Sequence, residues 1–345
     1  MVAFSIAAGD EARPVRDMPA PLIWVLHDGK PGMASQALGL AEATGFPFVE
    51  KQLSVRQPWA WLPPQFWLTP LRAVSEDGVR LMPPWPDLVI GCGRHSAMPA
   101  LAIRRASGGH TFAAQIQDPR VGRGEFDLLF VPEHDRLRGP RAIVTRGAIH
   151  RVTPVRLAEE RRRFPAFAGL PRPILGVLIG GSNRSYRLGF DRLAAIAEAI
   201  AGILRTNGGS AVVTPSRRTG AAGVALLRDR LAGLPAEIWD GAGDNPYYAY
   251  LAIADVLLVT ADSVSMVSEA AATGKPVHII ELASNRWGGD AKFARFHAMM
   301  REAGITRPFA GRIESWSYSP PDDTARAGTL LREQVLARLE QRRRA

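Results

Sequence analysis

The chain has 345 residues, of which 46% are apolar and 22% are charged, a composition typical of globular rather than disordered proteins. Its length suits two domains of about 150 residues each. The net charge is +10, but no motif of a nucleic-acid-binding fold occurs, so we expect no nucleic-acid partner.

Cysteine usage and hydropathy indicate a cytoplasmic protein. Cys92 is the single cysteine and cannot form an internal disulfide. The first residues lack the basic and long apolar stretches of a secretory leader, and no segment reaches the roughly 18 apolar residues of a membrane-spanning helix. Any membrane contact is expected to be peripheral, at the inner membrane face, where the basic tail 342–344 could touch anionic lipid. A solvated helix end is the simpler alternative for this tail.

Short apolar runs alternate with helical patterns from residue 22 onward, as in parallel sheets covered by helices. The expected elements of the first half are strands at 22–26, 87–91, 111–117 and 128–131, and helices at 33–44 and from about 96 to 108. Segment 58–86 is rich in Trp and Pro, and we expect it to be irregular or helical with packed aromatic rings.

A segment with several prolines and three consecutive arginines separates the two halves, so we expect an N-terminal domain at 1–165 and a C-terminal domain at 166–345. The expected elements of the second half are strands at 174–179, 211–214, 237–239, 256–260 and 276–280, and helices at 190–207, 223–231, 246–254, 265–273 and 329–341. The last helix could pack back on the first domain. The predicted fold class is α/β, with two Rossmann-like doubly wound domains facing a cleft.

Ligands of open α/β sheets bind beyond the carboxyl ends of the strands, and polar loops occur there in both halves. In the first half, Gly29 and Gly32 permit close backbone approach and Lys30 offers a positive charge. The loop lacks the Walker A and GxGxxG patterns, so a plain tight turn is an equal alternative. Asp28, His95 and Asp118 also fall at strand ends, where a capping or hydrogen-bonded structural role competes with a catalytic one.

In the second half, three loops carry groups that suit phosphate and ribose. Glycine, hydroxyl and amide groups follow one strand, Arg217 follows another, and Ser263, Ser265 and Glu269 follow a third. The alternatives are a solvated arginine pair, ordinary helix caps, and a glutamate that favours the helix dipole. The candidate donor-binding residues are Gly180, Gly181, Ser182, Asn183, Arg217, Ser263, Ser265 and Glu269.

Residues 262–270, followed by Gly274, Lys275 and Pro276, resemble the nucleotide-sugar signature of GT-B glycosyltransferases such as the peptidoglycan N-acetylglucosaminyltransferase. Over nearly its whole length the chain is more similar to bacterial relatives of the plant mitochondrial-fission family called "elongated mitochondria". The segments that carry this resemblance are 27–32, 91–94, 117–120, 180–183, 245–270 and 292–297. The family implies no settled chemistry, and its plant members are associated with recruiting a dynamin-type GTPase to the mitochondrial surface.

The resemblance to GT-B enzymes implies metal-independent transfer of sugar from a nucleoside-diphosphate sugar to an unknown acceptor. Asp28 and His95 are then the candidate bases that deprotonate the acceptor, and Gly29, Lys30, Gly32 and Asp118 form the acceptor side. No His or Cys spacing indicates a metal site, and no cofactor is expected. A non-catalytic adaptor that binds a protein or membrane partner is the alternative, and a nucleotide-sugar epimerase is a weaker one.

Overall fold

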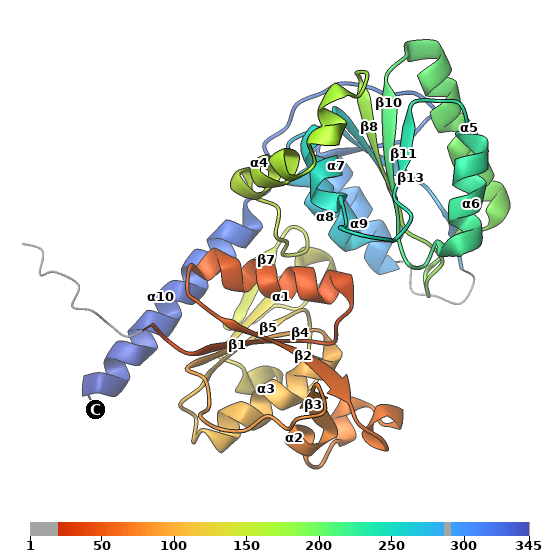
Figure 1. The fold of residues 1–345 in the computed structure, drawn as a ribbon. Coiled ribbons are helices and arrows are strands. Elements are labelled where there is room, and N and C mark those ends of the chain that lie inside the picture. Colours follow the sequence, from red (N-terminus) through yellow and green to blue (C-terminus); the bar gives the residue numbers. More distant parts are fainter. Residues whose placement is uncertain (1–19, 286–290, 345) are drawn as a thin grey trace, which may run out of the picture.

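The computed structural model describes residues 20–285 and 291–344, and in it two α/β halves lie one above the other (Figure 1). The expectation about a secretory leader concerns residues 1–19, which lie outside the described residues. Among the helices described, none is both long and apolar enough to cross a membrane.

The N-terminal half is a sheet of seven strands in the order β3-β2-β1-β4-β5-β6-β7, with β3 as its antiparallel edge. The strands are β1 (Ile23–His27), β2 (Val49–Val55), β3 (Val74–Glu76), β4 (Leu88–Cys92), β5 (Phe112–Ile116), β6 (Leu128–Pro132) and β7 (Ala142–Thr145). The helices are α1 (Pro31–Thr44), α2 (Pro70–Ala73) and α3 (Arg94–Ala106), with 3₁₀ turns η1 (Trp59–Trp61), η2 (Pro64–Phe66), η3 (Arg123–Glu125) and η4 (Glu133–Asp135).

Both faces of this sheet are covered, which explains its buried, continuous apolar strands. One face packs against α1 and the last helix, α10 (Asp323–Arg344), and the other packs against α3 and Trp67. α10 contributes Leu331 and Val335 to the core beside α1. At Gly328 the two helices come so close that a Cβ would lie 2.4 Å from the Cβ of Ala43.

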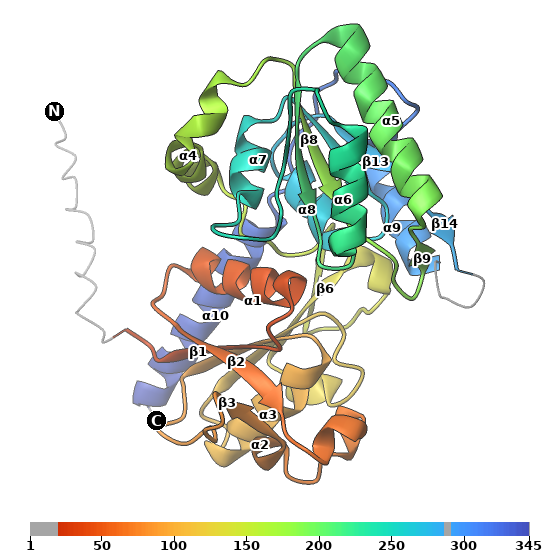
Figure 2. The same cartoon turned by 45° about the vertical axis from the view of Figure 1, so that its right-hand side comes forward.

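The C-terminal half contains a six-stranded parallel sheet in the order β11-β10-β8-β12-β13-β15. Its strands are β8 (Ile174–Ile179), β10 (Ser210–Pro215), β11 (Ala236–Ile238), β12 (Val256–Thr260), β13 (Val277–Ile280) and β15 (Thr306–Pro308); β9 (Tyr186–Arg187) and β14 (Ala283–Ser284) form a small ribbon. The helices are α4 (Pro154–Arg163), α5 (Phe190–Asn207), α6 (Gly220–Arg230), α7 (Tyr247–Ile253), α8 (Val264–Ala271) and α9 (Ala291–Glu302), with the 3₁₀ turn η5 (Pro165–Gly169). Figure 2 shows α5 and α6 on one side of the sheet and α7 and α8 on the other.

The α/β class with parallel sheets is confirmed, and the predicted helix at 190–207 coincides with α5. α4 lies within the expected N-terminal domain 1–165 but packs against α7 of the C-terminal half. The chain therefore leaves the first half before α4 and returns to it in α10. The order of strands places the switch in winding direction between β8 and β12, which makes the loops after these two strands neighbours.

Candidate functional site

The loop after β1 is organised by His27. This side chain is 1% exposed, and its Nε2 lies 2.8 Å from Glu50 Oε1. Its Nδ1 accepts a hydrogen bond from the N–H of Gly29, whose φ of 70° requires a glycine-like conformation. The predicted tight turn is therefore present, and His27 forms it.

Asp28 and His95 come together from the ends of β1 and β4. Asp28 Oδ2 lies 3.4 Å from His95 Nδ1, and Lys30 Nζ also contacts the carboxylate. Burial raises the pKa of Asp28, but hydrogen bonds from His95 and Lys30 outweigh it, so this pKa lies well below its ordinary value. An Asp28 carboxylate of low pKa is a weak base, and its contact with Nδ1 leaves the His95 ring nitrogen Nε2 outside this pair. Trp67 stacks on His95 with 6.2 Å between ring centroids.

Of the remaining acceptor-side residues, Gly32 lies at the contact between the halves and Asp118 does not. Gly32, the second residue of α1, lies beside α8, and a Cβ there would lie 3.3 Å from Ser265 Oγ. Asp118 instead accepts two hydrogen bonds from the Arg123 guanidinium, at 2.8 and 2.6 Å, and one from the N–H of Arg120. Asp118 thus stabilises its own loop rather than joining Asp28 and His95.

At the switch point of the C-terminal sheet, the predicted phosphate-binding loop already holds a carboxylate. The N–H of Gly181 donates to Asp262 Oδ2 at 3.0 Å, and the N–H of Gly180 donates to Thr260 Oγ1 at 2.8 Å. The Arg218 guanidinium lies 2.7 Å from the same Asp262 oxygen. Asp262 is 3% exposed, and its second oxygen, Oδ1, has no hydrogen-bond partner among the described residues.

The other donor-side residues serve the local backbone or reach solvent. Ser182 bonds to the backbone of Leu188, and Asn183 Nδ2 donates to the carbonyl of Asp262 at 3.0 Å. Arg217 is exposed, and its neighbour Arg218 is the arginine that reaches the loop. Sequence reasoning named Arg217 and not Arg218, because adjacent arginines after a strand carry no signal for which side chain turns inward.

Glu269 lies at the contact between the halves. It is 5% exposed, and its two oxygens accept hydrogen bonds from Ser35 Oγ at 2.7 Å and Tyr247 Oη at 2.6 Å. Burial raises the pKa of Glu269 despite these two donors. Ser263 caps α8 by accepting from the N–H of Met266, and Ser265 contacts Gln36 of α1 at 3.4 Å.

Several residues of this contact were not among the predicted site residues. Gln36 joins the halves through Ser265 and also accepts from Gln117 at 3.2 Å. Ser268 Oγ accepts the N–H of Ala148 at 2.9 Å, and a Cβ at Gly147 would lie 2.5 Å from it. A helical Gln or Ser has no local pattern that marks it as an interface residue.

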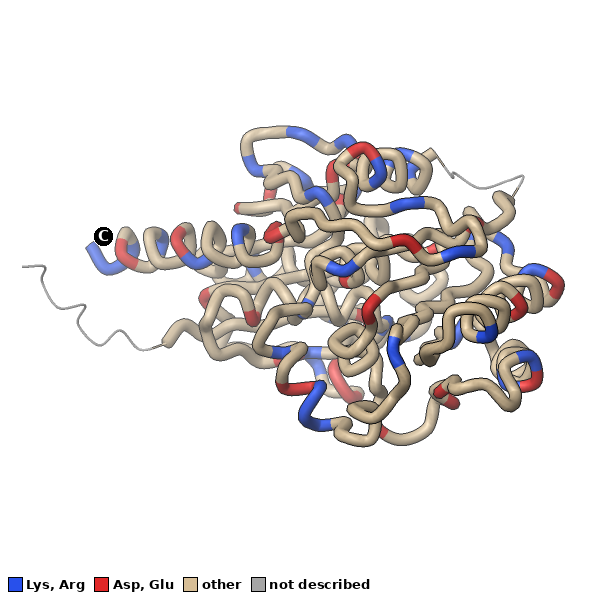
Figure 3. The backbone as a smooth tube through the Cα atoms, turned by 90° about the horizontal axis from the view of Figure 1, so that it is seen from above, with Lys and Arg blue, Asp and Glu red and all other residues tan. Residues whose placement is uncertain are grey.

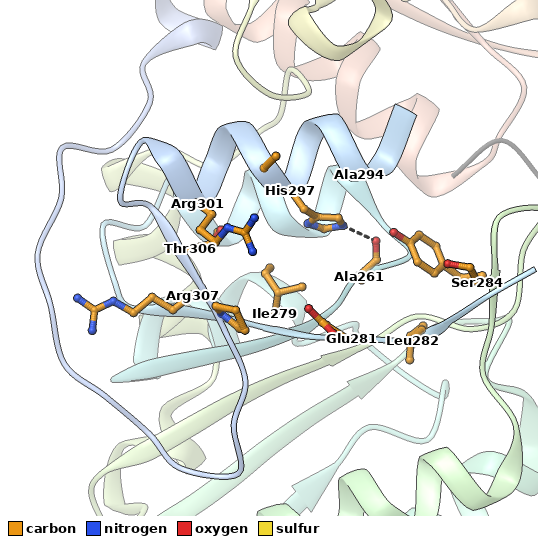
Figure 4. A pocket seen from close by; sticks show the side chains of 13 residues that line it. Ala261, Ile279, Glu281, Leu282, Ser284, Ala294, His297, Arg301, Thr306 and Arg307 are labelled. Atoms are coloured by element: carbon orange, nitrogen blue, oxygen red, sulfur yellow. Dashed lines mark hydrogen bonds between the residues drawn. The ribbon is translucent and has the colours of Figure 1, made fainter. Parts of the chain in front are cut away.

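A cavity of about 270 Å³ lies in the C-terminal half, between α9 and the ends of β12 and β13 (Figure 4). His297 lines it and lies with Nε2 2.8 Å from the Ala261 carbonyl, while Glu281, Arg301 and Arg307 add charge. None of the predicted site residues lines this cavity. Among the described residues, no group of three His, Cys, Asp or Glu side chains could hold a metal ion.

A family model described as "Mitochondrial fission ELM1" matches residues 31–335. The chain belongs to this family. The plant mitochondrial-fission likeness inferred from the motifs is thereby confirmed.

The relatives that match the chain include a plant and a bacterial protein. The mitochondrial fission protein ELM1 of Arabidopsis thaliana is 34% identical over 73% of this chain and 65% of its own length. An uncharacterised Rickettsia prowazekii protein, RP120, is 25% identical over 90% of this chain and 97% of its own length.

Solved structures confirm the GT-B-like fold. The UDP-GlcNAc 2-epimerase of Methanocaldococcus jannaschii aligns with a TM-score of 0.54 at 12% identity, over 92% of this chain and 99% of that one. This likeness concerns the fold of both halves and their order along the chain.

Proposed function

We propose that the chain binds a nucleoside-diphosphate sugar between its halves and transfers the sugar to a hydroxyl acceptor. The observation that carries the proposal is the meeting of two strand-end sites at the α1–α8 contact. On one side stand Asp28 and His95, and on the other stand Glu269 and the loop of Gly181. Gly32 against Ser265 brings the two edges together.

In the proposed reaction, His95 Nε2 takes the proton of the acceptor hydroxyl while Asp28 holds the ring through Nδ1. The acceptor oxygen forms a bond to the anomeric carbon, and the bond between the anomeric carbon and the diphosphate oxygen breaks. The departing diphosphate carries the negative charge, which the Arg218 guanidinium and the Gly181 N–H stabilise. Glu269 accepts hydrogen bonds from the ribose hydroxyls.

Binding of this ligand requires two internal contacts to open. Asp262 must release the N–H of Gly181, and the Ser35 or Tyr247 hydroxyl must leave Glu269 to the ribose. Because these internal contacts already satisfy the groups that a nucleotide sugar would need, they favour one second candidate function. This candidate is a non-catalytic adaptor that keeps the fold and binds a protein partner. No comparable observation favours an epimerase, because Asp28 and Glu269 each have non-carboxylate partners.

Titration calorimetry against UDP-, GDP-, ADP- and dTDP-sugars tests the proposal. We expect one of these donors to bind the wild-type protein and Glu269→Gln to weaken that binding about tenfold, because the Gln amide has one acceptor oxygen for the ribose hydroxyls where the carboxyl group has two. Glu237→Gln, at the exposed position of β11, is the matched control and should bind normally. Absence of binding by all four donor classes would favour the adaptor.

A further inference from the structure

The segment between β2 and β4 forms a lobe on the face of the N-terminal sheet that α10 does not cover. Trp67 anchors it: this residue is 3% exposed, and its Nε1 donates to the carbonyls of Trp59 and Leu62, both at 3.1 Å. The lobe packs against α3 through η2 and α2. It is therefore a built part of the domain, with a fixed outer surface.

Large apolar side chains lie on that outer surface. We define the apolar patch as Trp61, Leu62, Phe66 and Leu68, which are 78%, 43%, 60% and 89% exposed. Exposed to water, these four side chains do not gain the free energy that burial would provide. Such a cluster within eight residues indicates a surface that a binding partner covers.

The charges closest to the apolar patch along the chain are basic, and the first carboxylates after it are Glu76, which pairs with Lys51, and Asp77. Residues 56–75 include Arg56 and Arg72 but no Asp or Glu. The N–H of Arg56 donates to the carbonyl of Ala73 at 2.8 Å, which brings the backbones at these two arginines together. Both side chains are exposed and neither has an ion pair among the described residues, so their charge is available to an anionic partner.

The basic tail, by contrast, is largely engaged within the protein. On α10, Arg338 lies 2.9 Å from Asp127 and Arg342 lies 3.2 Å from Asp87. Figure 3 shows acidic residues interspersed with basic ones along this helix. In Figures 1 and 2, α10 runs along one side of the N-terminal half and the orange turns of the lobe lie on the other.

We propose that the apolar patch, with Arg56 and Arg72, docks the protein onto the surface of an anionic lipid bilayer. Tryptophan and phenylalanine on a rigid loop suit the boundary between headgroups and acyl chains, while the arginines suit lipid phosphates. No acidic side chain lies in residues 56–75, and the exposed Gln65 between Leu62 and Phe66 is neutral. Docking does not depend on the proposed transfer reaction.

The position of the lobe also concerns the acceptor. Trp67, which anchors the lobe, stacks on His95, so a docked bilayer lies on the acceptor side of the site.

Vesicle flotation in the absence of any nucleotide sugar tests the docking by itself. Wild-type protein should float with vesicles containing roughly one third phosphatidylglycerol in phosphatidylcholine, and much less with phosphatidylcholine alone. The partition coefficient should fall about tenfold or more in Trp61→Ser/Phe66→Ser and in Arg56→Gln/Arg72→Gln. Phe190→Ser, 58% exposed on α5, and Arg138→Gln/Arg162→Gln are the matched controls and should float like wild type.

A second measurement locates the contact. Brominated lipid should quench the tryptophan emission of the wild-type protein, and the quenched fraction should fall in Trp61→Phe, which keeps an aromatic ring in the patch. Failure of the wild type to float, or equal flotation of the patch and control variants, would overturn the proposal and would indicate that a protein covers the patch.

Discussion

The Arg218 guanidinium lies 2.7 Å from the Asp262 carboxylate, at the switch point between β8 and β12. In the proposed function, this is where the diphosphate binds. The protein therefore already places an anion of its own beside the N–H of Gly181 and the arginine that a phosphate would need. A ligand must replace that anion or share the arginine with it.

Removal of the Asp262 charge should strengthen diphosphate binding. In Asp262→Asn, repulsion of about 1 kcal/mol between carboxylate and phosphate is lost, which corresponds to roughly fivefold higher affinity for the free nucleoside diphosphate. Calorimetry measures this, with Asp244→Asn, whose side chain is 69% exposed, as the control. Equal or weaker binding by Asp262→Asn would mean that the carboxylate does not compete for the loop.

Loss of the His95 imidazole should slow the chemical step without weakening donor binding. We expect His95→Gln to reduce sugar-nucleotide hydrolysis, with water as acceptor, by about 10²- to 10⁴-fold, because the proton acceptor is gone. Asp28→Asn should also slow it by removing the group that orients the ring. Exposed His110→Gln serves as the control. Unchanged hydrolysis in His95→Gln would remove this residue from the mechanism.

Two helical glycines should respond in opposite directions to the same substitution. Gly328→Ala places a methyl group 2.4 Å from the Cβ of Ala43, and we expect about 1–3 kcal/mol lower free energy of unfolding. Gly202 of α5 has open space at this position, so Gly202→Ala should gain up to about 1 kcal/mol from helix propensity. Denaturant unfolding compares them, and a stabilising Gly328→Ala would show that α10 can move away from α1.

Stability should fall on acidification because buried histidines resist protonation. Burial lowers the pKa of His150 from 6.5 to about 4, and that of His134 likewise to about 4. Below pH 6.5 these two histidines are protonated in the unfolded chain, whereas in the folded chain they are protonated only at about pH 4. The neutral histidines therefore make their full contribution to the free energy of unfolding above pH 6.5. As the pH falls from 6.5 toward 4, each histidine lowers this free energy by about 1.4 kcal/mol per pH unit.

Denaturant unfolding at several pH values between 7 and 5 measures this slope. In His150→Gln the decline should be shallower than in the wild type, since one proton uptake by the unfolded state is removed. The exposed-site variant His110→Gln should keep the wild-type slope. Identical slopes in all three proteins would contradict the assignment to His150.

The strands that the sequence reveals best are those buried on both faces. β1, β8 and β12 are continuous apolar runs, and parallel strands covered by helices on both sides require such runs. β2 was missed because its residues Val49–Val55 are mostly exposed or half-buried and polar, as suits a strand next to the edge of the sheet. α4 was missed because prolines and arginines dominate the segment in which it lies.

The sequence by itself determined the two-part α/β architecture and the loops at which polar groups follow strands, because these depend on local patterns of burial and turn chemistry. Only the tertiary structure decided what those groups contact. Glu269 meets Ser35, which lies 234 residues earlier, and Asp28 meets His95 from another strand. Gly181 meets Asp262 because β8 and β12 are neighbours in the sheet. Such partners depend on strand order and on the packing of one half against the other, and neither leaves a pattern in the surrounding residues.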